Sequence, residues 1–377
     1  MAKKSGSGGG SIYRVKNGWR GQLTIGDQRI SVTKRTKTEV LQALAEARTD
    51  YSRGVFIFAS DVTVEEWVNN WLEQKVSPKL AEQSLIRLEG LFRNHLLPVL
   101  GDFKLQDLTQ SLLEQKYAEI FQNKAKKTGR DYSEDTYSHS TVNSLSASFK
   151  KCLQFAVEKG VLQHNPHEGV ELHKLRPPKK IDAYELDDHK KIVDFTRNNG
   201  QLYWIYYLLI ATGMRFGEAA ALTWSDVNLK KRTIKINKTS VELHGSPIIQ
   251  PHPKTSAGNR TISIPENVAD FLAEAKKSLD PELNYRNLVI PNTRYNIITS
   301  ANTNRRWKKV CAALNIPYQG VHSLRHTWAT RALEKGIDVK TVSAMLGHKN
   351  VITTMNIYQD VLANHKADAA DKMSDLF

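Results

Sequence analysis

The chain has 377 residues, 40% of them hydrophobic, which is enough for two or three independent cores. Its 54 Lys and Arg against 39 Asp and Glu give a formal net charge of +15, which indicates a polyanionic partner, either nucleic acid or an acidic membrane surface. No apolar run approaches the roughly 20 residues of a membrane span, and no signal-peptide pattern opens the chain, so a membrane or secreted protein is excluded and a cytoplasmic one expected.

A Gly/Ser-rich leader occupies residues 1–10, and we leave it outside the fold. A small domain is expected over residues 11–58. It begins with three short strands, at 12–16, 19–25 and 29–33, which are separated by Gly-containing turn signals.

A helix should follow, because Thr36 and Glu39 have the spacing of a capping box ahead of an apolar helical face. Residues 1–60 hold 11 Lys and Arg against 4 Asp and Glu. A basic sheet can enter a DNA groove, so we interpret this domain as a DNA-binding module, with a solvated basic surface as the alternative. The candidate DNA contacts are Arg14, Lys16, Arg20 and Arg29.

Residues 61–175 predict an all-helical domain, which opens with a second capping box at Thr63 and Glu66. A basic polar loop within it carries Lys126 and Lys127, so the bundle could hold a duplex. A helical spacer with solvated lysines is the competing interpretation. The chain's two cysteines lie in apolar helical patterns, which predicts buried thiols. They are Cys152 and Cys311.

A linker is expected at 176–181, where paired prolines stand beside Lys179 and Lys180, two further candidate DNA contacts. Residues 182–360 then predict a mainly helical domain with strands at 233–237 and 260–264. A helical stripe in the tail, 361–377, completes the chain. The expected fold class is multidomain and mainly α with small β-sheets (α+β).

Arg215 follows Gly213 at the end of an apolar run. A glycine lets the backbone turn, and it would bring the arginine to a helix N-terminus, where oxyanions are favoured. We therefore predict that Arg215 clamps a phosphate and that Glu218, one helical turn on, orients it.

His322 and Arg325 are three residues apart, so on a helix they share a face and can reach one phosphate. His322 and His326 also have the spacing of helical zinc ligands, and His348 could serve as a third ligand. The neighbouring arginines oppose a dication, so no metal is expected, and His326 taken alone suits a core histidine or a supporting role.

Tyr358 lies ten residues after His348. A tyrosine near pH 7 is mostly protonated and is a weak nucleophile, so it needs a proton acceptor and positive groups that disperse the leaving charge. Taken alone, Tyr358 would be a half-buried aromatic, and only the full ordered set of residues favours a catalytic role.

These boxes closely resemble those of the tyrosine recombinases, or phage-type integrases, in order and in spacing. The resembling segments are Thr212-Gly213-Met214-Arg215-Phe216-Gly217-Glu218, His322-Ser323-Leu324-Arg325-His326, Leu346-Gly347-His348 and Tyr358. The resemblance implies an arm-type DNA-binding domain at the N-terminus, a helical core-binding domain and a mixed α/β catalytic domain.

The resemblance also implies roles for single residues. Arg215 and Arg325 would hold the scissile phosphate, while Tyr358 would attack it to give a 3′-phosphotyrosine and a free 5′-hydroxyl. Lys254 would protonate the leaving oxygen, with Lys238 as the nearby alternative. His322 would take part in proton transfer to and from Tyr358, and His348 would donate a hydrogen bond to the phosphate.

The implied protein is a site-specific integrase of a mobile element that needs no metal, cofactor or ATP. Its expected partners are double-stranded DNA with core and arm sites, three further copies of the chain, a host DNA-bending protein and a directionality factor, in a bacterial cell at the nucleoid. Three alternatives stay open: a non-catalytic DNA-binding protein on the same fold, a type IB topoisomerase, and a metal-dependent nuclease built on the three histidines.

Overall fold

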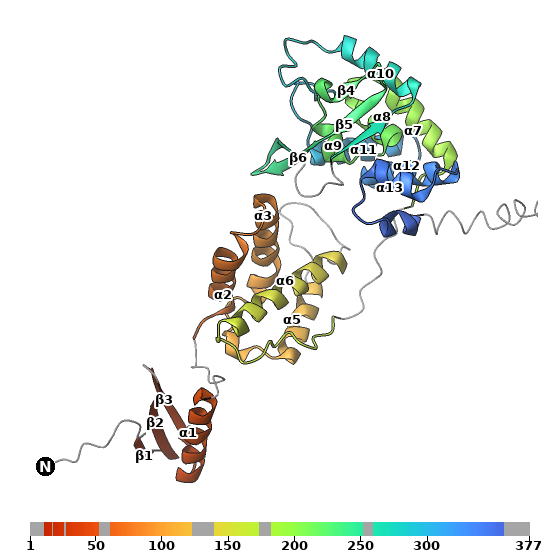
Figure 1. Cartoon of the computed structure of the whole chain (residues 1–377). Coiled ribbons are helices and arrows are strands. Elements are labelled where there is room, and N and C mark those ends of the chain that lie inside the picture. The colour runs from red at the N-terminus through yellow and green to blue at the C-terminus, as the bar shows by residue number, and fades with distance from the viewer. Residues whose placement is uncertain are drawn as a thin grey trace, which may run out of the picture. The chain divides into compact units, whose positions relative to one another are not determined.

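The computed structural model describes residues 11–16, 18–25, 28–52, 61–122, 139–172, 182–251 and 259–357. The chain forms two compact units, Met1–Pro178 and Lys179–Phe377. Helices predominate in both units and the sheets are small and antiparallel, so the predicted α+β fold class is confirmed (Figure 1). No helix in the described part of the chain is long and apolar enough to cross a membrane.

The first unit begins with a three-stranded antiparallel sheet, in the order β1-β2-β3. Its strands span Ser11–Val15, Gly18–Ile25 and Gln28–Lys34, each within two residues of its predicted bounds. One helix, α1 (Lys37–Ser52), lies along the sheet (Figure 1).

Helix α1 packs closely on the middle strand, β2. A Cβ placed on Gly21 would come within 2.3 Å of Val40 Cγ1 and 2.7 Å of Leu44 Cδ1, so only glycine fits there. Leu23, Val40 and Leu44 form the buried core of this layer. The helix starts where the sequence predicts, since the Glu39 amide donates to Thr36 Oγ1 and the Thr36 amide donates to Glu39, each over 3.2 Å.

The rest of the described first unit is helical, as predicted. The second capping box is present, with the Glu66 amide donating to Thr63 Oγ1 over 3.2 Å. Trp67 and Trp71 lie in the core, and the indole N–H of Trp67 donates to the Cys152 carbonyl over 3.1 Å. The helical segments are α2 (Val64–Trp71), the π-turn η1 (Leu72–Val76), α3 (Glu82–Leu91), the π-turn η2 (Phe92–Leu96), α4 (Leu97–Leu100), the 3₁₀ turn η3 (Leu105–Asp107), α5 (Gln110–Gln122) and α6 (His139–Glu158).

The second unit places helices around an antiparallel sheet of order β4-β5-β8. Its helical segments are α7 (Leu186–Asn198), η4 (Gln201–Tyr203), α8 (Trp204–Thr212), α9 (Phe216–Ala220), η5 (Trp224–Asp226), α10 (Glu266–Ser278), α11 (Ser300–Ala313), α12 (His322–Glu334) and α13 (Val339–Leu346). Its strands are β4 (Val227–Asn228), β5 (Thr233–Ile236), β6 (Lys238–Leu243), β7 (Ser246–Pro251) and β8 (Arg260–Ser263).

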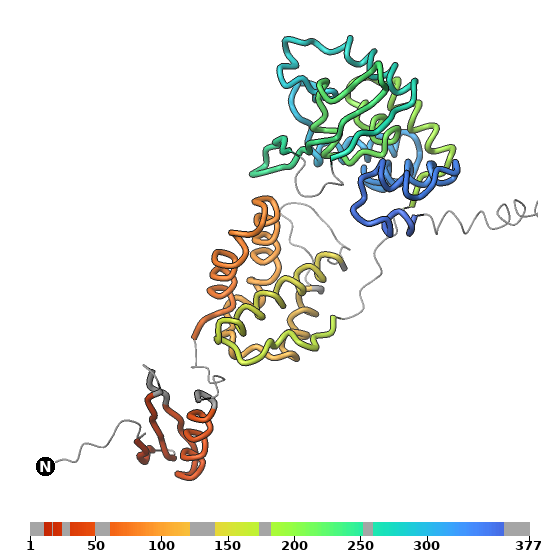
Figure 2. The backbone as a smooth tube through the Cα atoms, in the orientation of Figure 1, coloured from red at the N-terminus to blue at the C-terminus, as the bar shows by residue number. Residues whose placement is uncertain are grey.

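The strands predicted at 233–237 and 260–264 are β5 and β8, whereas the β6–β7 hairpin was not predicted. Figure 2 shows the hairpin extending from the rest of the unit as a two-stranded ribbon. His244 and Gly245 form its tight turn, both with positive φ, 48° and 78°. Such a pair suits a two-residue hairpin turn, so a His-Gly signal was available in the sequence.

Helix α8 is the centre of the second unit's core. Every residue from Trp204 to Ile210 is buried, because neighbours cover all faces of the helix. Cys311 is buried beside the Tyr184 hydroxyl, at 3.7 Å, and Cys152 is buried in the first unit. Both thiols are free and buried, as predicted, and burial raises the pKa of each.

Candidate active site

Gly213 ends α8 and turns the chain toward Arg215. It has a φ of +67°, and a Cβ at this position would come within 2.7 Å of the Trp328 ring. A side chain would therefore meet both backbone strain and a clash. Arg215 then stands at the N-cap of α9 with an extended backbone, so the turn predicted from the sequence is present.

Arg325 is the buried cation of α12. Its residue is 3% exposed, and its two terminal nitrogens donate to the carbonyls of Gly213 and Leu346, each over 2.8 Å. A guanidinium has five N–H donors, so these two bonds leave others for an oxyanion. His322, one turn earlier, lies at the start of the same helix.

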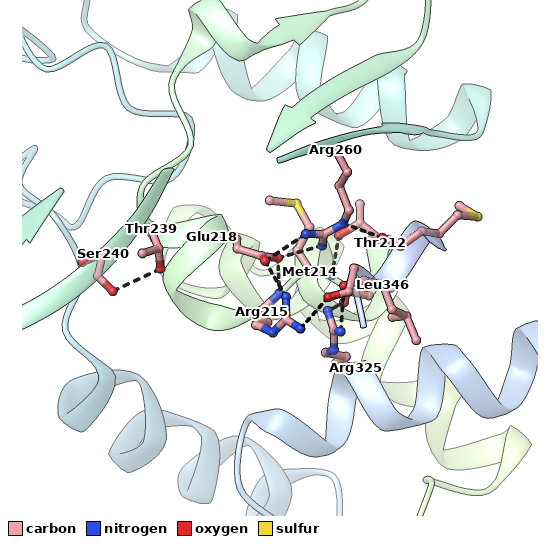
Figure 3. Close-up of polar contacts among 12 residues, drawn as sticks. Thr212, Met214, Arg215, Glu218, Thr239, Ser240, Arg260, Arg325 and Leu346 are labelled. Carbon is pink, nitrogen blue, oxygen red and sulfur yellow. Dashed lines mark hydrogen bonds and ion pairs between the residues drawn. The ribbon is translucent and has the colours of Figure 1, made fainter. Parts of the chain in front are cut away.

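Glu218 is buried and connects two arginines, Arg215 and Arg260. Its side chain is 1% exposed and accepts from Arg215 Nη1 over 2.8 Å, as the sequence predicted. It also accepts from both terminal nitrogens of Arg260, over 3.0 and 2.8 Å (Figure 3). Arg260 was not among the predicted site residues. Arg260 donates two parallel hydrogen bonds to the Glu218 carboxylate, which is 42 positions away in the sequence. No sequence pattern connects the two residues, so the sequence shows only an arginine at the start of a strand.

The C-terminal end of α13 holds all three guanidiniums. Three successive carbonyls at this end accept one bond each from the arginines. Met345 O accepts from Arg260 Nε over 2.7 Å, Leu346 O accepts from Arg325 Nη2 over 2.8 Å, and Gly347 O accepts from Arg215 Nη2 over 2.9 Å. The last carbonyls of a helix have no partner within it and form the negative end of its dipole, so this end attracts cations. Figure 3 shows Arg215, Arg260 and Arg325 meeting around Leu346 and Glu218.

The cluster carries an excess of positive charge, three guanidiniums against one carboxylate. Burial opposes ionisation of Glu218, but Arg260 and Arg215 outweigh it and lower the pKa to about 2, so Glu218 stays ionised. Burial and the neighbouring Arg215 lower the pKa of Arg325 to about 9. A buried cation whose charge is disfavoured in this way gains from a bound anion, so the cluster suits a phosphate.

The two histidines of the predicted set lie in the field of these arginines. Desolvation and then Arg325 and Arg215 lower the pKa of His322 and bring that of His348 to about 4. His348 is therefore a neutral ring near pH 7. Its Nδ1 is 2.8 Å from the Thr354 hydroxyl, a contact that the sequence reasoning missed.

The rival zinc interpretation receives no geometric support. Within the described ranges, which include all three histidines, no group of three His, Cys, Asp or Glu side chains could hold a metal ion. His326 is half-buried on α12, and its core or supporting role stays a prediction.

Several predicted site residues lie outside the described residues. They are Lys126, Lys127, Lys179, Lys180, Lys254 and Tyr358, together with the leader, the linker and the tail 361–377. The alternative to Lys254 is described: the ammonium of Lys238 is 2.6 Å from Asp226 and donates to Thr223 over 2.7 Å. Ile357, one residue before Tyr358, packs on a cluster that contains Leu346 of α13.

The predicted DNA contacts of the small sheet do not share one face. Arg14 pairs with Trp19, which packs on the core beneath α1, whereas Arg20 pairs with Tyr13 and Thr33 on the opposite face. Side chains of directly paired residues point to the same side of a sheet. Lys16 is exposed beyond the end of β1, and the side chain of Arg29 lies outside the described set.

Comparisons with known proteins give the class of this site. The Phage integrase family matches residues 184–365, and the Phage integrase, N-terminal SAM-like domain matches residues 63–126. The tyrosine recombinase XerC-like protein of Caldanaerobacter subterraneus subsp. tengcongensis is 27% identical over 395 residues, which cover 96% of this chain and 98% of that protein. The integrase of Staphylococcus phage L54a is 26% identical over 302 residues, 72% of this chain and 82% of the relative.

Solved structures share the fold. The Tn1549 transposon integrase in complex with a circular intermediate DNA has a TM-score of 0.65 at 19% identity, covering 84% of this chain and 99% of that one. A lambda integrase tetramer bound to a Holliday junction has a TM-score of 0.56 at 16% identity, covering 90% and 95%. The chain therefore belongs to the phage integrase family of tyrosine recombinases. It is a site-specific recombinase, an enzyme that cleaves and rejoins DNA strands.

Proposed function

We propose that the chain is the integrase of a mobile element and that its arginine cluster holds the scissile phosphate. The observation that carries this proposal is the meeting of Arg215 and Arg325, more than a hundred residues apart in sequence, at one helix end. Both keep N–H donors that no other residue in the described part of the chain uses. Arg260 differs, because each of its three nitrogens donates to a protein group and its side chain is 8% exposed, so we assign it to positioning Glu218 and not to DNA contact.

Tyr358 is the proposed nucleophile. Its phenolic oxygen attacks phosphorus, the bond to the 5′-oxygen breaks, and a 3′-phosphotyrosine and a free 5′-hydroxyl result. The lowered pKa of His322 keeps its ring neutral, so it can accept the phenolic proton, and Lys254 supplies a proton to the leaving oxygen. The two guanidiniums neutralise the charge that develops on the phosphorane. The covalent bond conserves the energy of the cleaved one, so a second 5′-hydroxyl can reseal the strand without ATP.

The other domains follow as parts of the same proposal. Residues 11–58 bind arm-type sites, residues 61–175 bind the core site, and residues 182–360 cut, with a linker at 176–181 and a docking tail at 361–377. The proposed assembly is four chains on two duplexes, supported by the lambda integrase tetramer on a Holliday junction. A host DNA-bending protein and a directionality factor complete the proposal, with the work done on bacterial DNA at the nucleoid.

The test is covalent capture in excess chelator. The full chain is incubated in EDTA with a nicked duplex that carries the candidate junction, and any adduct is mapped by denaturing gel and peptide analysis. We expect an adduct at Tyr358, and we expect Tyr358→Phe to abolish the adduct while binding in a gel-shift assay stays nearly unchanged.

Each alternative predicts a different result. Binding to a verified target without an adduct would favour the non-catalytic DNA-binding protein. Supercoil relaxation without exchange at defined sites would favour a type IB topoisomerase. Cleavage that the chelator abolishes would favour the metal-dependent nuclease.

A further inference from the structure

Thr354 is a buried residue in an exposed segment. It is 0% exposed, whereas its neighbours Thr353 and Met355 are exposed. Its hydroxyl oxygen lies 2.8 Å from His348 Nδ1, and among the described residues this is the hydroxyl's one hydrogen-bond partner. A buried hydroxyl at this distance from a ring nitrogen fixes which atom carries the proton.

The hydroxyl must be the donor of this bond. A buried O–H needs an acceptor, and in the described surroundings His348 Nδ1 is the acceptor that is present. If Nδ1 carried a proton instead, the hydroxyl hydrogen would be left unpaired in the interior, at a cost comparable to a lost hydrogen bond. Desolvation and the nearby guanidiniums lower the pKa of the ring to about 4, so near pH 7 it is neutral and has a single proton. That proton therefore sits on Nε2.

We propose that Thr354 is a positioning residue, which locks His348 as the Nε2–H tautomer so that the ring donates to an oxygen of the scissile phosphate. The inference rests on the proposed function of His348. The same bond joins His348 to the segment that leads to Tyr358, four residues further on. A neutral donor adds a hydrogen bond to the transition state without adding a fourth charge to three crowded guanidiniums.

Three single variants separate this role from a packing role. Thr354→Val keeps the shape of the side chain but removes the hydroxyl donor. Thr354→Ser keeps the hydroxyl donor but removes a methyl group. Thr353→Val is the matched control, because it replaces threonine with valine at the exposed neighbouring position. We expect single-turnover cleavage by Thr354→Val at saturating enzyme to be about 5- to 30-fold slower, the factor for about 1–2 kcal/mol when a buried group loses its hydrogen-bond partner. Thr354→Ser should stay within about 3-fold of the parent, and Thr353→Val within about 2-fold.

A direct readout comes from ¹⁵N spectra of the His348 ring in the histidine-labelled full chain near pH 7. The parent and Thr354→Ser should show a protonated Nε2 and a bare Nδ1, whereas Thr354→Val should show a mixture. In a His348→Ala background, Thr354→Val should have no further effect on cleavage, because the positioning residue acts only through the ring.

Three results would overturn the inference: a protonated Nδ1 in the parent, a Thr354→Val rate equal to the parent's while His348→Ala is slow, or an undiminished Thr354→Val effect in the His348→Ala background. Failure of the proposed function would look different. The parent would then form no Tyr358 adduct, whereas the ring spectra would still report the tautomer.

Discussion

Replacing Glu218 with Gln should be one of the costliest isosteric changes in the second unit. The change keeps the shape but removes a charge that is 1% exposed and that pairs with the buried Arg260 and the partly exposed Arg215. Breaking a buried ion pair by neutralising one partner costs about 3–5 kcal/mol, because the other charge stays buried and unpaired. The lowering of the Glu218 pKa from 4.5 to about 2 corresponds to about 3 kcal/mol, in agreement.

The assay is denaturant unfolding of the full chain at pH 7, with hydrogen exchange of α8 and α12 amides identifying the transition of the second unit. Glu266→Gln is the matched control. Glu266 also pairs with an arginine, Arg232, but at 3.6 Å and with both side chains more than half exposed, so its loss should cost about 0–1 kcal/mol. If Glu218→Gln costs no more than Glu266→Gln, the carboxylate does not hold the cluster together.

The pH dependence of the same variant gives a second check. A carboxyl group with a lowered pKa in the folded state contributes stability that is present above its unfolded pKa and is lost as the pH falls through the folded value. The contribution of Glu218 should therefore disappear between about pH 4.5 and pH 2. Glu218→Gln should lack this component, so the stability difference between parent and variant should shrink on acidification. A constant difference would contradict the argument.

Three further predictions concern stability and cleavage. Gly213→Ala should cost about 3 kcal/mol, since it adds a clash with Trp328 to the strain of a positive φ, whereas Gly336→Ala, with a φ of +80° and open space, should cost about 1 kcal/mol in the same unfolding assay. Arg260→Lys should lose the forked bond to its carboxylate partner and slow adduct formation about 10-fold in a single-turnover gel assay, with DNA affinity unchanged. The pKa of His348 is lowered to about 4 in the folded chain. Between about pH 6.5 and pH 4 the unfolded chain therefore binds a proton that the folded chain does not, so the free energy of unfolding should decrease as the pH is lowered through this range. His348→Asn should flatten that slope in unfolding midpoints.

The sequence predicted the local part of the site correctly. Local geometry fixes the turn at Gly213, the helix start at Arg215 and the pairing of Arg215 with Glu218. The residues involved are within a few positions of one another, and helix geometry determines which side chains are neighbours at that spacing. His322 and Arg325 lie on one helix, α12, and their joint contact with a phosphate stays a prediction. The roles of Lys254 and Tyr358 stay predictions.

The sequence could not show the partners that hold these side chains. Arg260 meets Glu218 only because β8 and α9 are folded against the same core, and no spacing rule connects positions 42 residues apart. The carbonyls of Met345, Leu346 and Gly347 are main-chain atoms, which every residue carries, so no residue type marks them. The contact of Thr354 with His348 could not be predicted for a related reason. Thr353 and Thr354 are the same residue type in adjacent positions, and only burial in the folded chain distinguishes them.

At the end of α13, the same arginines stabilise the fold and form the proposed phosphate site. Its last carbonyls need donors, and an unsatisfied buried carbonyl costs about as much as a lost hydrogen bond. The arginines that supply those donors come from the α9 cap, from β8 and from α12, so the proposed phosphate site forms only when all three segments have docked on α13. Replacing Arg215 or Arg325 by Ala removes a donor to the end of α13 together with a proposed phosphate ligand. Lost cleavage in such a variant therefore measures catalysis only after its unfolding free energy has been measured and found unchanged.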